Sequence, residues 1–130
     1  MRTLALLTLL AATSAFAATD ADREKAFKAD IAPILEKSCS NCHDPKKAKN
    51  GKVKSGFDIT SLATIVKGGK ENGPGITWGD TSKSTLFTAS ELGLNNPTED
   101  PAMPPKKSQE KNPALTKAQL EKVKAFIAAK

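Results

Sequence analysis

Metal-binding and aromatic side chains are scarce in this chain. Its 130 residues include one histidine, two cysteines, two methionines, one tryptophan and no tyrosine. A closed structural zinc site normally takes four Cys or His ligands, and this chain offers only three, so structural zinc is disfavoured. Small domains bury a smaller fraction of their surface than large ones, and this chain has few bulky side chains to compensate. We therefore expect another group to fill part of the core.

Long apolar runs are also absent, except near the N-terminus. There, Arg2 precedes an uncharged apolar stretch over residues 4–12, and small residues follow it up to Ala15-Phe16-Ala17. This is the pattern of a secretory signal with an A-x-A cleavage site. The stretch is shorter than the roughly 20 residues that a membrane-spanning helix needs. We predict a cleaved signal peptide over residues 1–17, a periplasmic location, no stable membrane insertion, and a single domain over residues 18–130.

The charge of the chain is positive, with 20 Lys and Arg against 14 Asp and Glu. A basic protein can bind nucleic acid, an acidic membrane or an acidic protein. The export signal and the lack of aromatic residues among the lysines argue against nucleic acid. The composition therefore leaves an acidic membrane surface and an acidic protein as candidate partners.

Both cysteines and the only histidine lie in the stretch "KSCSNCHD", at Cys39, Cys42 and His43. A disulfide across such a short loop would stabilise the fold little. A thioredoxin-like pair would need a βαβ pattern, which does not surround the motif. C-x-x-C-H is the attachment motif of c-type haem, in which both cysteines form thioethers and the histidine binds iron. We predict one haem c at these three residues.

The second axial ligand of such an iron has few candidates. No other histidine exists, and Met1 would leave with the signal peptide, so Met103 is the remaining thioether. It lies in a polar, proline-rich segment and precedes Pro104-Pro105, which restrict the backbone around it. We predict that Met103 binds the iron. An open sixth position and a lysine ligand remain the alternatives.

Hydrophobic periodicity predicts an all-α fold of about four helices joined by long loops. The expected helices cover residues 22–38, with Pro33 as a kink or a new first turn; residues 60–68, capped near Thr60 or Ser61 and ended by Gly68; residues 82–93, capped by Ser82 and ended by Gly93; and a last helix whose N-cap is Thr116. Loops of this length in a small domain usually need a ligand to order them.

Several segments resemble the class I, monohaem cytochromes c. The segments "DIAPILEKSCSNCHD", "SGFDITSLATIVKGG", "GDTSKSTLF", "AMPP" and "LTKAQLEKVKAFI" are similar in order and spacing to the M-P-P cytochrome domains of bacterial periplasmic proteins. The resemblance implies the cytochrome c fold, in which the last helix packs across the first. It also implies thioether attachment at Cys39 and Cys42, and axial ligation by His43 and Met103. Phe126 stands where many relatives have Trp, so this helix contact should persist with less buried area.

The function expected from these features is one-electron transfer rather than catalysis. We expect a monomer that docks redox partners with acidic surfaces, because seven lysines follow the two ligand segments and would form a positive ring around the haem edge. These lysines are Lys46, Lys47, Lys49, Lys52, Lys54, Lys106 and Lys107. They would equally suit solvated loops kept for solubility.

The sequence alone leaves two points open. The first is the function: the chain could instead be a peroxidase-like haem enzyme or sensor with a labile sixth position, the small cytochrome subunit of a periplasmic dehydrogenase, or a haem-free thiol or zinc module. The second is Trp78, which could donate a hydrogen bond to a haem propionate or be a buried packing residue.

Overall fold

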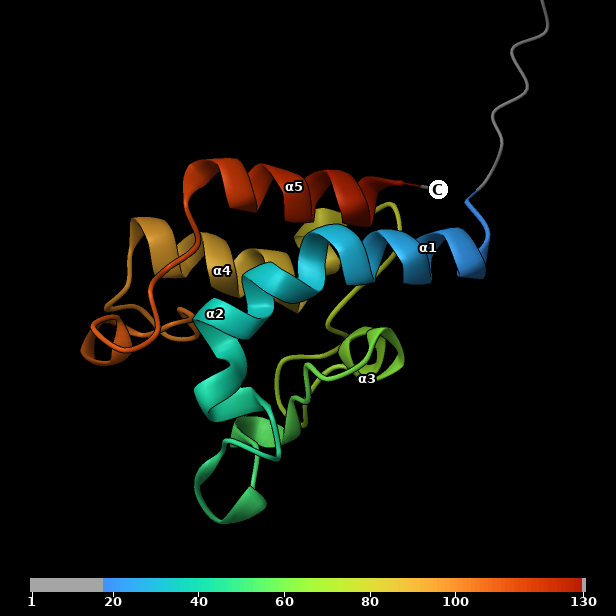
Figure 1. The fold of residues 1–130 in the computed structure, drawn as a ribbon. Coiled ribbons are helices and arrows are strands. Elements are labelled where there is room, and N and C mark those ends of the chain that lie inside the picture. The colour runs from blue at the N-terminus through green and yellow to red at the C-terminus, as the bar shows by residue number, and fades with distance from the viewer. Residues whose placement is uncertain (1–17, 130) are drawn as a thin grey trace, which may run out of the picture.

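The computed structural model describes residues 18–129, and this part of the chain contains helices and no strand. The α-helices are α1 (Asp20–Ala26), α2 (Ala32–His43), α3 (Leu62–Lys67), α4 (Thr85–Asn95) and α5 (Lys117–Ala128). A π-helical turn, η1 (Phe27–Ile31), joins α1 and α2 without a break, so four separate helices result (Figure 1). The predicted all-α fold is confirmed. The predicted signal peptide lies outside the described residues, and none of the described helices is long and apolar enough to cross a membrane.

The first helix carries the C-x-x-C-H motif on its last turns. It begins after Thr19, whose side chain forms a capping box with Asp22. Pro33 lies in the first turn of α2, directly after the π-helical turn. The prediction that Pro33 marks a new first turn is therefore confirmed. The helix extends beyond the predicted residue 38 and ends at His43, so helical geometry fixes the spacing of the motif.

Helix α3 has the predicted ends, and α5 begins where the sequence predicted. Ser61 caps α3 and forms a capping box with Thr64, and α3 ends at Gly68, whose φ of 81° suits glycine. Thr116 caps α5 in the same way with Gln119.

Helix α4 differs from the prediction at both ends. Ser84, not Ser82, is its N-cap, because residues Thr81–Lys83 form a separate 3₁₀ turn capped by Asp80. Gly93 lies inside the helix and does not end it. The physical reason is that another backbone segment passes against Gly93 at a distance that leaves no room for a side chain.

Four short 3₁₀ turns lie in the long connections between the described helices. They are η2 (Lys49–Gly51), η3 (Lys54–Gly56), η4 (Thr81–Lys83) and η5 (Lys106–Ser108). The lysine-rich segment between α2 and α3 is mostly exposed, as predicted for a solvated loop.

The hydrophobic core joins the first helix to α4 and α5, and α5 lies beside α1 (Figure 1). Phe126 of α5 packs on Phe27, with ring centroids 6.4 Å apart, and on the edge of Trp78 at 5.3 Å. The contact between the first and last helices therefore persists with Phe at position 126, as expected.

We predict that Phe126→Ala lowers the free energy of unfolding by about 3–5 kcal/mol, because it empties the space between two packed rings. Denaturant unfolding of the purified protein measures this change. Lys124→Ala, at an exposed position of the same helix, should leave the unfolding midpoint nearly unchanged. Equal midpoints for the two variants would contradict the packing described here.

Candidate functional site

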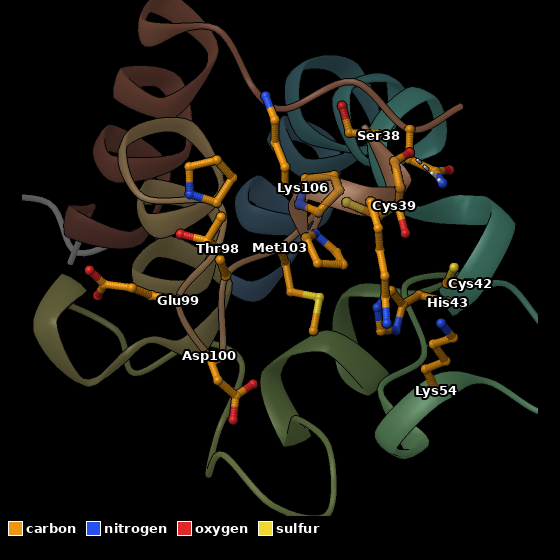
Figure 2. Close-up of a pocket in the computed structure, with 17 residues that line it drawn as sticks. Ser38, Cys39, Cys42, His43, Lys54, Thr98, Glu99, Asp100, Met103 and Lys106 are labelled. Carbon is orange, nitrogen blue, oxygen red and sulfur yellow. Dashed lines mark hydrogen bonds between the residues drawn. The ribbon is translucent and has the colours of Figure 1, made fainter. Parts of the chain in front are cut away.

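A cavity of about 490 Å³ opens between the end of the first helix and the segment that follows α4. Cys39, Cys42, His43 and Met103 all line it, and Figure 2 shows their side chains around this space. The structure therefore brings together the four residues that the sequence singled out, although Met103 is far from the other three in the sequence.

The two cysteines lie on the last turns of α2, three positions apart, so that both thiols reach the same side of the helix. They are not bonded to each other. Burial raises the pKa of the Cys39 thiol to about 12, mainly by desolvation and to a smaller extent through the nearby Cys42. Thiol–disulfide oxidoreductases need a thiol with a lowered pKa. The environment of Cys39 has the opposite effect, which argues against a redox-active dithiol.

His43 is the last residue of α2, and one of its ring nitrogens is fixed by the backbone. Its Nδ1 lies 2.9 Å from the carbonyl oxygen of Phe57. A carbonyl can only accept a hydrogen bond, so Nδ1 carries the proton and Nε2 keeps its lone pair. The Phe57 ring contacts the imidazole edge-on, with centroids 5.5 Å apart. His43 is thus held in the tautomer that can bind a metal through Nε2.

The Phe57 carbonyl is itself held in place by the surrounding loop. The N–H of Ile59 donates to the His43 carbonyl at 3.0 Å, and the N–H of Phe57 donates to the Lys54 carbonyl at 3.1 Å. Sequence reasoning could not identify this acceptor, because every residue has a backbone carbonyl and only the loop path selects one.

The charge state of His43 is shifted toward the neutral form. Desolvation lowers the pKa of its imidazole, and the positive charge of Lys54 lowers it further. The hydrogen bond to Phe57 acts in the opposite direction.

Met103 reaches the cavity from the proline-rich segment after α4. Its backbone N–H donates to the carbonyl of Ala89 in α4 at 2.8 Å, and its half-buried side chain projects into the cavity from a different segment than His43 (Figure 2). A smaller cavity of about 60 Å³ is also lined by Cys39, His43 and Met103 and by apolar residues of α4. The two cavities are therefore parts of one site.

The comparison with known protein families agrees with this geometry. The family described as Planctomycete cytochrome C matches residues 39–107, which include both cysteines, the histidine and Met103. The chain belongs to the Planctomycete cytochrome C family. No curated protein and no solved structure gives a significant match.

Membership of the Planctomycete cytochrome C family makes the protein a c-type cytochrome, and its cavity suits a haem. The volume lies within the roughly 300–1,000 Å³ typical of cofactor sites. Its walls offer two unpaired thiols, an imidazole nitrogen with a free lone pair and a thioether sulfur, which together form a donor set for c-type haem. Over residues 18–129, no three His, Cys, Asp or Glu side chains are grouped to hold a metal ion.

Helix α2 of this cytochrome is tied to the segment that follows Met103. The side-chain amide of Asn41 donates to the Asn112 side-chain oxygen at 2.9 Å, and the buried Asn112 also lines the cavity. Asn41 lies between the two cysteines, so the motif helix and the Met103 segment are linked across the cavity. Sequence patterns do not predict this pair, because its two residues are far apart in the chain.

Trp78 of the cytochrome is not among the residues that line the cavity. It packs against the core beside Phe126, and the Arg23 guanidinium lies 4.5 Å from the centre of its ring. This position fits the interpretation of Trp78 as a packing residue. A cation–π contact between helix α1 and the core explains why a tryptophan is present.

The cavity rim of the cytochrome carries both charges. Lys54, Lys106 and Lys107 line it, together with Glu99 and Asp100. The other four lysines of the expected ring are not among the lining residues, and Lys47 pairs with Glu36 on α2. Only three of the seven lysines expected around the haem edge therefore line the cavity.

Proposed function

We propose that this cytochrome is a periplasmic electron carrier with one haem c, held through thioethers to Cys39 and Cys42, with His43 as the proximal and Met103 as the distal axial ligand. When bound, the haem supplies a one-electron couple between ferrous and ferric iron. The observation that carries the proposal is that all four side chains line one cavity, with a free Nε2 on His43. The periplasmic location rests on the N-terminal sequence pattern.

The residues of the site support electron transfer rather than substrate chemistry. His43 is fixed by Phe57, and the Met103 backbone is fixed by Ala89, so both ligands are placed before any redox change. Ligands that stay in place keep the rearrangement between oxidation states small, and a sixth position occupied by Met103 leaves no place for a substrate. A thioether ligand would also raise the reduction potential relative to a site with two histidine ligands.

Partner recognition is proposed at the cavity rim. Lys54, Lys106 and Lys107 are exposed around the opening where electrons would enter, and they suit an acidic partner. Glu99 and Asp100 on the same rim would limit the orientations in which such a partner docks.

The replacement Met103→Leu tests the axial ligand, because it removes the sulfur while nearly conserving side-chain volume. We expect loss of the far-red methionine-to-iron charge-transfer band of the ferric protein and a lower reduction potential. Optical redox titration measures both.

The matched control is Leu120→Met, the reverse exchange at a buried position of α5 outside the cavity. It should leave both properties unchanged. If Met103→Leu has the spectrum and potential of the wild type, the sixth position is open or held by another residue, as in the enzyme alternative.

The rim proposal predicts that Lys106→Glu/Lys107→Glu slows oxidation of the ferrous protein by the anion ferricyanide several-fold at low salt, because the local attraction is reversed. Stopped-flow mixing measures the rate. The control Lys122→Glu/Lys124→Glu changes the net charge equally on exposed positions of α5. Equal rates for the two double variants would show that only total charge matters and would remove the basis for docking at this rim.

A further inference from the structure

The Met103 segment passes against helix α4 at a point where the helix has no side chain. A Cβ built on Gly93 would lie 2.1 Å from the Met103 carbonyl oxygen, 2.5 Å from its carbonyl carbon and 3.0 Å from the nitrogen of Pro104. These are backbone atoms, so no rotamer change could relieve the overlap. One turn earlier, the Ala89 carbonyl accepts the Met103 N–H at 2.8 Å. The backbone of Met103 therefore rests directly on the helix.

The conformation of Gly93 does not itself require glycine. Gly93 lies inside α4 and does not have a positive φ. Glycine at an interior helix position costs up to about 1 kcal/mol relative to alanine. Its presence here is explained by the close approach of Met103 and by nothing in the helix itself.

Gln109 forms hydrogen bonds to both sides of this contact, to helix α4 and to the Met103 segment. Its Nε2 donates to the Gly93 carbonyl at 2.7 Å and to the Pro104 carbonyl at 3.0 Å. Gly93 is in the last turn of α4, where carbonyls lack an intrahelical partner, so this hydrogen bond satisfies a group that the helix leaves free. One side-chain amide thus joins the end of α4 to the residue that follows Met103.

We infer that Gly93 and Gln109 are positioning residues for Met103. The missing side chain at position 93 lets the Met103 backbone approach α4, and Gln109 holds it there, so together they set how far the thioether reaches into the cavity. The inference rests on the proposed function, because the reach of Met103 affects the iron only if Met103 is an axial ligand.

The first test is Gly93→Ala in the haem-loaded protein. The added methyl group pushes the Met103 backbone away from α4, so we expect loss of the far-red methionine-to-iron band and a lower reduction potential. Alanine favours the helix, so the far-ultraviolet circular dichroism should not decrease. Glu91→Ala is the matched control, because it introduces the same residue at an exposed position of α4, and it should keep the band and the potential.

The second test is Gln109→Leu, which removes both hydrogen bonds and adds no atom beside Met103. We expect added imidazole to displace Met103 from the ferric iron with a Kd about tenfold lower than in the wild type. Such a change corresponds to about 1.4 kcal/mol, which is within the range of two hydrogen bonds. Glu110→Leu, the same replacement at the neighbouring exposed position, should leave the imidazole affinity unchanged. If Gly93→Ala fails to load haem, Gln109→Leu decides the question.

The outcomes separate this inference from the proposed function. A wild-type protein without the methionine-to-iron band would overturn both, because Met103 would then not be a ligand. A wild-type protein with the band, together with unchanged band, potential and imidazole affinity in both variants, would overturn the positioning role alone.

Discussion

The contact between the Met103 backbone and helix α4 is the constraint on which the site depends. Met103 lies in the long connection between α4 and α5, before its 3₁₀ turn η5, and the hydrogen bond to Ala89 and the close approach at Gly93 give it a fixed position. On the facing side of the cavity, His43 needs no contact of this kind with another helix. It ends α2 and is oriented by the carbonyl of Phe57. One wall of the cavity is therefore set by local helix geometry and the other by a tertiary contact.

This division has consequences for the proposed electron carrier. The two cysteines and His43 keep their relative positions as long as the last turns of α2 remain helical. Met103 keeps its place only while the segment after α4 stays attached to the helix and to Gln109. The distal side is thus the part of the site where small sequence changes can alter the potential or open the iron to other ligands, whereas the proximal side is tied to the helix itself.

Much of the fold followed from sequence patterns because its signals are local. The caps at Ser61 and Thr116 and the role of Pro33 depend on residues within one or two turns, and these predictions are confirmed. The prediction that Gly93 ends a helix is wrong. A glycine near the end of an apolar pattern usually ends a helix, but here only the tertiary structure brings Met103 against it. Sequence patterns could not predict three other features for the same reason. These are the acceptor for His43, the Asn41–Asn112 pair and the contacts of Trp78, and each depends on residues distant in the sequence.

The claim that supports every other part of the proposed function is that Cys39 and Cys42 hold one haem covalently. The most direct test is the intact mass of the protein under denaturing, reducing conditions, after expression in a host that attaches haem to c-type cytochromes. We expect the mass of the polypeptide plus one haem, with neither cysteine available to an alkylating reagent. A polypeptide of unmodified mass with two alkylatable thiols would contradict it.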